Sequence, residues 1–490
     1  MLPSPSELFV QAARPVARST DPTSVAGSCH NGDVADDGTG RRPAWPSLLV
    51  LCVAAVLLGV SCGSADTVMP GTSAQAPPAI DLDPSVPFPR TATYFLEHND
   101  IPTVDELARY DVVVLDNEWA NRLPRAFFDE LRIKNPQIEL LAYVNLIDSV
   151  HEIGAENYWQ NAYKLWQINS DRETEFPDEW LARTADGTPV HEWQDRVMAN
   201  LTDLAPRLDG LLYVEYAVDW VAEQVWSSGV WDGIFLDVWG ERIFSADSDR
   251  WDIDRDGYDD LDEDIYGPGK PLDRGLTIGE DRLRAKIPDA ILVANGARTM
   301  RDGRLNGVVF ENFADPAHDR DPAFDLDAYV TAAASDEARD PRLTMTINKQ
   351  DSGAAPPDAL RKARFEFVAT LLQNGFWAPM GANYGAIEYY DEMDGGGLGK
   401  DYLGHALERS PTMDDLSKPN DEGTGSPAPG VFRRDFDNGI ALLNSTDAPV
   451  EIRLESSYQK LRGTQDPVTN DGSRVDTVTV PAQDGIVLVR

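Results

Sequence analysis

The chain has 490 residues, of which 42% are apolar, enough for one large domain with a substantial core and a smaller second domain. Its 83 acidic residues outnumber 43 basic ones, and the formal net charge of −40 argues against nucleic acid or an anionic membrane surface as partner. The three cysteines, Cys29, Cys52 and Cys62, all precede the predicted folded body, which excludes a thiol nucleophile, a disulfide framework or a cysteine-ligated zinc site there.

An apolar run at residues 48–60 is too short to cross a bilayer and has the length of a signal-peptide core. Cys62 follows this run, and the arrangement resembles a bacterial lipoprotein signal. We therefore expect a protein lipid-anchored at Cys62 to a bacterial membrane, at the cell surface or outside the cell. Gly59 stands where such signals usually carry leucine, so an ordinary secretory signal cleaved nearby is the alternative. Residues 1–62 are interpreted as an extension and leader, and residues 63–89, rich in proline and serine, as an extended linker.

From residue 90 onward, apolar runs alternate with amphipathic stretches, the pattern of βα units. We expect helices at 104–109, 125–133, 211–226, 276–286 and 357–374. Strands are expected at 93–96, 112–116, 140–145, 197–202, 233–237, 290–295, 307–311 and 343–347. Eight strands over this length predict an α/β fold, a (β/α)8 TIM barrel spanning residues 90–407, rather than an open doubly wound sheet.

The pattern changes after the barrel. Residues 408–430 are rich in proline and glycine and indicate a loop or linker. In residues 431–490, short alternating strands are expected at 432–436, 440–444, 450–454, 475–480 and 486–489. Asp437-Asn438-Gly439 is a strong hairpin-turn signal between the first two. This segment is predicted to be a small antiparallel β-sandwich.

Two of the predicted barrel strands consist of apolar residues and end in a carboxylic acid, Asp237 in one and Glu311 in the other. The carboxyl ends of parallel barrel strands lie on one face, where such barrels place their chemistry. Cleavage of a glycosidic bond needs one carboxylate to attack or stabilise the anomeric centre and one acid to protonate the leaving oxygen. We predict that Asp237 fills the first role and Glu311 the second. For either acid alone, a structural ion pair or helix cap is the alternative.

Further polar and aromatic side chains stand at the ends of predicted strands. Amides, carboxylates and aromatic rings suit sugar hydroxyls and the apolar faces of sugar rings. Two of these residues, Trp119 and Trp239, are predicted to stack on sugar rings. The predicted substrate-binding residues are Asp116, Glu118, Trp119, Tyr143, Asn145, Asp203, Trp239 and Asn295.

One motif stands apart from the barrel pattern. Residues 252–263 match the twelve-residue calcium-loop pattern, with Gly257 at the sharp turn. The predicted ligands are Asp252, Asp254, Asp256, Tyr258 through its carbonyl, Asp260 and Glu263. Gly267-Pro268-Gly269 soon follows and prevents a long exit helix, so we expect a structural Ca2+ site rather than a sensor that opens.

The strand-end motifs together resemble a known family. They are Asp116-Asn117-Glu118-Trp119, Ala142-Tyr143-Val144-Asn145, Asn200-Leu201-Thr202-Asp203, Asp232-Gly233-Ile234-Phe235-Leu236-Asp237 and Phe310-Glu311-Asn312. Residues 90–385 and the terminal β domain are similar to a hypothetical glycosyl hydrolase group of (β/α)8 barrels. That group is related to endo-α-1,4-polygalactosaminidases and more distantly to α-galactosidases and α-amylases. The resemblance implies that Asp237 is the nucleophile and Glu311 the acid/base. Polygalactosaminidase substrates are cationic, which would suit an acidic protein.

Motifs of serine hydrolases, zinc proteases, P-loops and dinucleotide-binding folds are absent from the sequence, and no organic cofactor is expected. The leading hypothesis is therefore a surface-tethered glycoside hydrolase acting on a polysaccharide or oligosaccharide. The alternative is a non-catalytic carbohydrate-binding lipoprotein that keeps the barrel. Convergence of Asp237 and Glu311 at one place would favour the enzyme, and a salt bridge that takes one of them away would favour the binding protein.

Overall fold

The computed structural model describes residues 86–96, 101–149, 176–193, 196–314, 322–349, 356–381, 384–417 and 429–490. The predicted leader and Cys62 lie outside the described residues, as does most of the predicted linker. Within the described part of the chain, no helix is both long and apolar enough to cross a membrane.

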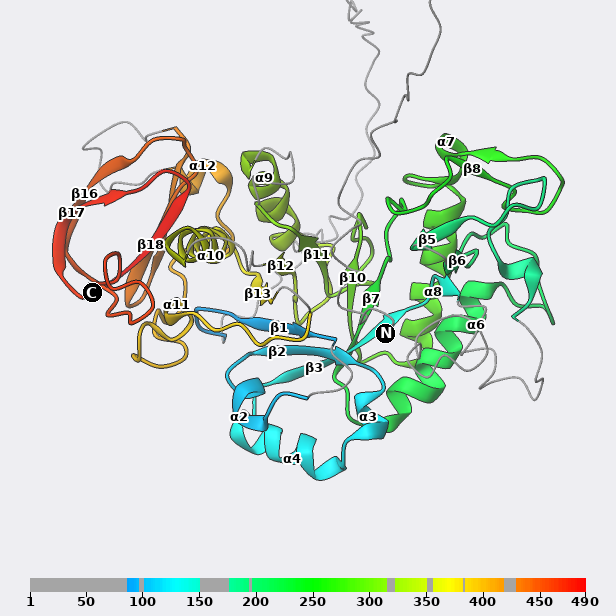
Figure 1. Ribbon diagram of the computed structural model, residues 1–490, viewed down its shortest axis with the longest axis horizontal. Coiled ribbons are helices and arrows are strands. Elements are labelled where there is room, and N and C mark those ends of the chain that lie inside the picture. The colour runs from blue at the N-terminus through cyan, green and yellow to red at the C-terminus, as the bar shows by residue number, and fades with distance from the viewer. Residues whose placement is uncertain are drawn as a thin grey trace, which may run out of the picture. The chain divides into compact units, whose positions relative to one another are not determined.

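Eight parallel strands form the main sheet, in the same order as in the chain (Figure 1). The sheet closes on itself where the Trp377 backbone N–H donates to the carbonyl of Arg90, at 3.1 Å. The fold is thus the predicted (β/α)8 barrel. Its strands are β1 (Ala92–Phe95), β2 (Val112–Asp116), β3 (Glu139–Asn145), β7 (Gly233–Asp237), β10 (Ile291–Asn295), β11 (Gly307–Glu311), β12 (Met345–Lys349) and β13 (Phe376–Met380).

Side chains of these strands alternate between two apolar layers, as the period of two of a β-strand requires. Those that point inward pack with one another along the barrel axis, for example Tyr94, Phe235 and Val309. Those that point outward, such as Phe95 and Leu236, pack against the surrounding helices. Burial on both faces explains the nearly continuous apolar sequence of the strands.

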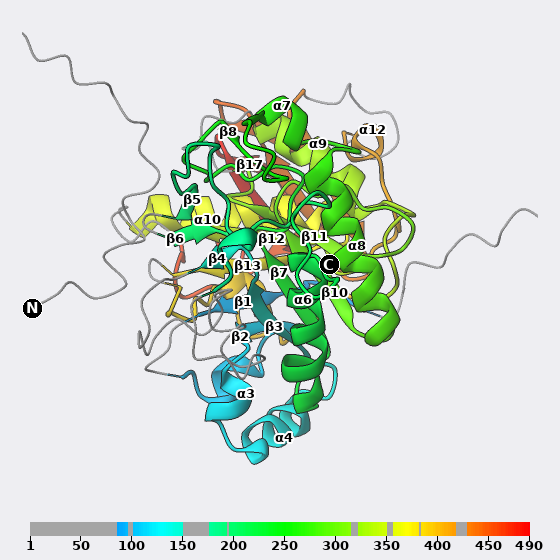
Figure 2. The ribbon, with the colours of Figure 1, turned by 90° about the vertical axis from the view of Figure 1, so that its right-hand side faces the viewer.

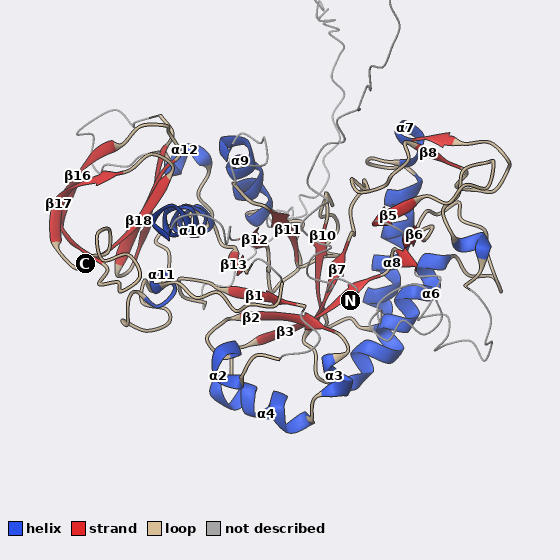
Figure 3. Ribbon diagram, viewed as in Figure 1, coloured by secondary structure: helices blue, strands red, loops and turns tan. Residues whose placement is uncertain are grey.

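Helices lie around the outside of the strands in both views of the ribbon (Figures 2 and 3). Local sequence explains where some begin: Thr103 caps α2 in a capping box with Glu106, and Pro271 opens α8. The helices are α2 (Val104–Leu107), α3 (Trp119–Arg122), α4 (Arg125–Lys134), α6 (Tyr213–Trp220), α7 (Asp262–Ile265), α8 (Pro271–Lys286), α9 (Pro322–Ala333), α10 (Pro356–Leu371), α11 (Asp391–Asp394) and α12 (Met413–Leu416). A π-helical turn, Val221–Val225, extends α6.

One predicted barrel strand is wrong. Residues 197–202 do not join the barrel; instead β6 (Arg196–Met198) lies between β4 (Asp148–Ser149) and β5 (His191–Trp193) in a small antiparallel sheet. The eighth barrel strand is β13, which is not among the strands predicted from the sequence. Pro379 lies inside β13, and proline within a run argues against a central strand.

The terminal strands form one continuous antiparallel sheet in the order β14-β15-β18-β16-β17, and the predicted hairpin turn joins the first two. Their bounds are Val431–Phe436, Gly439–Asn444, Asp484–Val489, Val450–Lys460 and Arg474–Val480. The buried Arg364 of α10 attaches this sheet to the barrel, because its guanidinium donates to both carboxylate oxygens of Asp484 at 3.0 and 2.8 Å. A Cβ at Gly485 would lie 2.5 Å from that of Val368, so helix and sheet are in close contact.

Candidate functional site

The two predicted catalytic acids converge at the carboxyl ends of their strands. Asp237 ends β7 and Glu311 ends β11, and β10 lies between them and ends in Asn295. The Asn295 side-chain amide donates to Asp237 Oδ1 at 2.9 Å and to Glu311 Oε2 at 3.2 Å. Because one nitrogen contacts both oxygens, these two oxygens can be no more than about 6 Å apart, close to the spacing of a glycosidase carboxylate pair.

Asp237 is surrounded by donors. The Tyr143 hydroxyl donates to Asp237 Oδ2, and the Val238 backbone N–H also hydrogen-bonds to this carboxylate. Burial raises the pKa of Asp237 to about 6, and the charge of Glu311 adds to the rise, whereas the bonds from Tyr143, Asn295 and Val238 limit it. The carboxylate therefore remains mostly ionised at neutral pH although it is desolvated.

A cluster of aromatic side chains lies next to the two acids. The ring of Tyr94 on β1 lies 5.7 Å from that of Tyr143, 5.2 Å from that of Phe235 and 5.9 Å from that of Tyr384. The Lys349 ammonium, at the end of β12, lies 5.7 Å from the Tyr384 ring centroid. Tyr94 and Tyr384 are not among the site residues predicted from the sequence. Tyr94 could have been predicted, because inward-facing and outward-facing side chains alternate along a strand and Tyr94 occupies an inward-facing position of the predicted strand at 93–96.

The chain turns sharply after each acid. Val238 and Asn312, the residues that follow Asp237 and Glu311, have left-handed backbone conformations with φ of 51° and 53°. The turn lets the next backbone N–H reach the neighbouring strand, from Trp239 to the Asn295 carbonyl at 2.7 Å. A β-branched residue such as valine rarely adopts this conformation, so strain is stored directly beside Asp237.

Several other predicted substrate-binding residues lie at the same ends of the strands. Asp116 at the end of β2 is 2% exposed, and its carboxylate accepts from the Glu118 backbone N–H at 3.0 Å. Asn145, at the end of β3, is level with Asp237 in the strand register, and its side chain accepts from Ile147. Glu118 is partly buried just before α3.

Both predicted ring-stacking tryptophans are placed where they present no free ring face. Trp239 is fully buried between barrel and helices, and its indole N–H donates to Glu280 at 3.0 Å. Trp119 is 4% exposed, with the Arg122 guanidinium 4.7 Å above its ring. In this structure neither ring is exposed enough to stack on a sugar. Asp203 forms a two-point ion pair with Arg274, at 2.6 and 2.9 Å, instead of presenting its carboxylate to a ligand.

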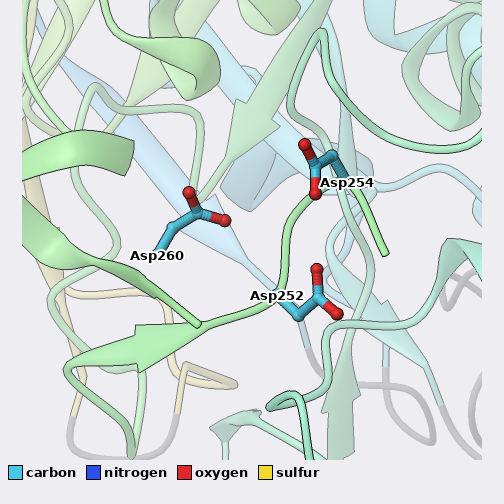
Figure 4. A group of neighbouring side chains, drawn as sticks. All are labelled: Asp252, Asp254 and Asp260. Atoms are coloured by element: carbon cyan, nitrogen blue, oxygen red, sulfur yellow. The ribbon is translucent and has the colours of Figure 1, made fainter. Parts of the chain in front are cut away.

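The predicted calcium loop connects the short strands β8 (Arg250–Trp251) and β9 (Asp260–Leu261). Carboxylate oxygens of Asp252, Asp254 and Asp260 lie within 4.8 Å of one another (Figure 4). Two of the predicted carboxylate ligands fall outside this group: Asp256 accepts from the Tyr258 N–H, and Glu263 lies exposed in α7.

The same loop is attached to the segment between β3 and α6. Arg255 donates to the carbonyls of Asp178 and Leu181, at 2.6 and 2.8 Å, and the buried Asn200 amide donates to the Ile253 carbonyl at 2.8 Å. The loop therefore joins two insertions on the side of the barrel that carries Asp237.

A (β/α)8 barrel with acids at the carboxyl ends of its strands has the architecture of many glycoside hydrolases, and the family match assigns the chain to that class. The sequence matches the hypothetical glycosyl hydrolase family 15 over residues 132–440, and the chain belongs to this family. None of the curated proteins matches the chain.

Solved structures similar to this chain include three from bacteria. The glycoside hydrolase domain of PelA from Pseudomonas aeruginosa is 16% identical, covering 59% of this chain and 94% of that one, with a TM-score of 0.35. An α-amylase from Anoxybacillus is 9% identical, covering 79% and 89%, with a TM-score of 0.39. A GH36 α-galactosidase from Geobacillus stearothermophilus is 10% identical, covering 82% and 55%, with a TM-score of 0.37. At these values the likenesses carry no argument about activity.

The raised pKa of Asp237 predicts a pH-dependent stability. The folded protein holds a proton here up to pH about 6, whereas an ordinary aspartate in the unfolded chain releases it near pH 4. The free energy of unfolding should therefore fall as pH rises through this window. We expect Asp237→Asn to be more stable than the wild type by about 2 kcal/mol at pH 7 and equal to it near pH 4, by urea unfolding.

Asp219→Asn provides a control of opposite sign. Burial alone would raise the pKa of Asp219, but hydrogen bonds from Arg282 and Lys286 lower it. Loss of this carboxylate should therefore destabilise the protein at pH 7. Identical pH slopes for the wild type and Asp237→Asn between pH 4 and 7 would contradict the assignment.

Proposed function

We propose that this protein is a glycoside hydrolase that cleaves an O-glycosidic bond in a polysaccharide or oligosaccharide, with Asp237 and Glu311 as its catalytic pair. The observation that carries the proposal is the shared hydrogen bond from Asn295 to both carboxylates. Among the described residues, neither acid forms a salt bridge with lysine or arginine, which favours an enzyme over a non-catalytic binding protein.

Hydrogen bonding supports the division of roles. Asp237 accepts from Tyr143, Asn295 and the Val238 backbone, and this set of donors stabilises the ionised form that a nucleophile needs. Glu311 accepts only from Asn295 among the described residues, which leaves its second oxygen available to a leaving group. We therefore assign Asp237 as nucleophile and Glu311 as general acid and base.

The spacing of the pair supports retention of anomeric configuration. Retaining enzymes hold their carboxyl groups about 5–5.5 Å apart, whereas inverting enzymes need about 6.5–9.5 Å to admit a water. The distance between Asp237 Oδ1 and Glu311 Oε2, at most about 6 Å, is closer to the retaining spacing than to the inverting one.

The reaction proceeds in two displacements. Asp237 forms a bond to the anomeric carbon while the bond to the leaving oxygen breaks, and Glu311 gives that oxygen its proton. A water then attacks the anomeric carbon of the glycosyl–Asp237 ester, and Glu311 takes the proton of the water. Asp237 leaves as a carboxylate, and both acids return to their starting states.

Isosteric variants test the pair. Asp237→Asn and Glu311→Gln should fold normally but lower kcat by a factor of about 10² or more, since general acid catalysis alone is worth that much. Purified protein is screened against neutral and galactosamine-containing polysaccharides. The anomeric form of the first product, followed by NMR, tests retention. Asp281→Asn, which removes an exposed partner of Arg304, serves as the control. If either isosteric variant works at nearly the wild-type rate, that residue is not catalytic.

We further propose that the loop at 252–263 binds one structural Ca2+. Its sequence pattern and the three gathered carboxylates support this, and Asp256, the Tyr258 carbonyl and Glu263 are the remaining proposed ligands. Apo, three carboxylates this close repel one another, and a divalent cation would remove that cost.

Calcium should raise the melting temperature of the protein. An ion several hundred-fold above its Kd stabilises the fold by about 3–4 kcal/mol, which a chelator would remove. Asp254→Asn should abolish the calcium-dependent shift, whereas Asp281→Asn should keep it. A melting temperature that is the same with chelator and with added calcium would rule the site out.

We also propose that the protein is exported and lipid-anchored through Cys62, on the basis of the apolar run that precedes this cysteine. Mass spectrometry of the native protein should find an N-terminus at Cys62 carrying acyl chains, and Cys62→Ser should release the protein from the membrane fraction. An unmodified N-terminus elsewhere in a freely secreted protein would contradict the anchor.

A further inference from the structure

Tyr94 lies inside the barrel next to the proposed catalytic pair. It occupies an inward position of β1, is 6% exposed, and packs edge-on against Tyr143, whose hydroxyl donates to Asp237. Burial is the main reason that the pKa of Tyr94 lies well above its usual value. The charges of Tyr143, Asp237, Tyr384 and Glu311 raise it further, so the phenol is within electrostatic range of both acids. The phenol therefore keeps its proton and can donate a hydrogen bond.

The Tyr94 hydroxyl makes no hydrogen bond to any residue that the structure describes. Other buried tyrosines of the barrel do: Tyr110 donates to the Glu388 carbonyl at 2.5 Å, and Tyr329 to the Thr370 carbonyl at 2.7 Å. The hydroxyl is also not one of the completely enclosed polar atoms that lack a partner, such as the Trp119 indole nitrogen. It therefore borders space that a solvent molecule or a ligand can enter.

Packing alone does not explain a hydroxyl in this position. Phenylalanine would fill the same space, and the Tyr94 hydroxyl gains no hydrogen bond from the described part of the chain. The neighbouring inward position on β7 is in fact phenylalanine, Phe235, whose ring packs against Tyr94. A donor retained beside two carboxylates is explained if a bound molecule supplies the missing acceptor.

We propose that Tyr94 binds the substrate: its hydroxyl donates a hydrogen bond to an oxygen of the sugar held between Asp237 and Glu311. This inference rests on the proposed glycoside hydrolase function and extends it. Asp237 and Glu311 approach the anomeric centre from strands β7 and β11, whereas Tyr94 reaches the same sugar from β1. Sugars are rich in acceptor oxygens, and a site that hydrogen-bonds one hydroxyl discriminates against the analogue that lacks it.

The test separates binding from folding by comparing two Tyr→Phe variants. Both are made in the Glu311→Gln background, so that hydrolysis of bound sugar is slowed during titration. Maltotetraose and an α-1,4-linked galactosamine tetrasaccharide are the probes, measured by calorimetry. Tyr94→Phe should weaken binding of the tighter probe about tenfold, the worth of one well-placed hydrogen bond, without lowering the melting temperature. Tyr110→Phe loses a bond to Glu388, so it should melt lower but bind the probe unchanged.

Monodeoxy analogues of the tighter probe then identify the contacted oxygen. The analogue that lacks it should bind wild-type and Tyr94→Phe sites, each in the Glu311→Gln background, equally well, whereas the other analogues should keep the tenfold difference. Unchanged affinity of Tyr94→Phe for the parent sugar overturns the role of Tyr94 and leaves the proposed catalytic pair standing. If neither probe binds the Glu311→Gln protein or the wild type, the proposed carbohydrate site is wrong, and so is the role of Tyr94 in it.

Discussion

One side-chain amide organises the candidate site. Asn295 donates to Asp237 and Glu311 at once, and it can do so only because β10 lies between β7 and β11 in the barrel. Two carboxylates at this distance repel each other, so a shared donor lowers the cost of keeping them together. Tyr143 adds a second donor to Asp237 from the strand on the other side of β7. The pair is thus positioned by neighbouring strands rather than by flexible loops, and a rigid position is what a reaction sensitive to an error of about 1 Å needs.

The strands that carry the acids are constrained at both ends. Gly233 and Gly307 begin them, and a Cβ there would lie 2.3 Å from the Ile291 carbonyl oxygen and 2.0 Å from that of Leu343. Val238 and Asn312 end them with left-handed backbone. Close packing at the start and a strained turn at the exit leave each acid little freedom to move along its strand. Strain at Val238 persists only where the surrounding structure compensates for it, and the hydrogen bond from Trp239 to the Asn295 carbonyl contributes to this.

Strand periodicity explains which parts of this site could be predicted from the sequence. Asp237, Asn295 and Glu311 end apolar runs, and their parity places them all inward, so their convergence follows from a closed parallel sheet. Trp239 stands two residues beyond Asp237 and would be inward by the same parity. The left-handed turn at Val238 redirects it into the layer between barrel and helices, where Gly279 leaves room for its indole. A turn of this kind at a valine has no sequence signal. The strand β13 was missed for a related reason, because Pro379 within it argues against a central strand.

The acidic loop is structurally separated from the acids although it follows Asp237 in the chain. The insertion that contains it leaves the barrel at Glu241 and returns there, since the Gly267 N–H donates to the Glu241 carbonyl at 2.9 Å. Beneath this point the buried Arg298 pairs with Asp273 and Glu280 of α8, and breaking such a buried network costs about 3–5 kcal/mol. A movement of the loop would therefore have to disturb this buried ion-pair network before it could displace Asp237. The acidic residues of the loop can therefore affect the stability of the fold without changing the pKa of Asp237. That pKa is set by burial, by the charge of Glu311 and by donors that include Asn295 and Tyr143.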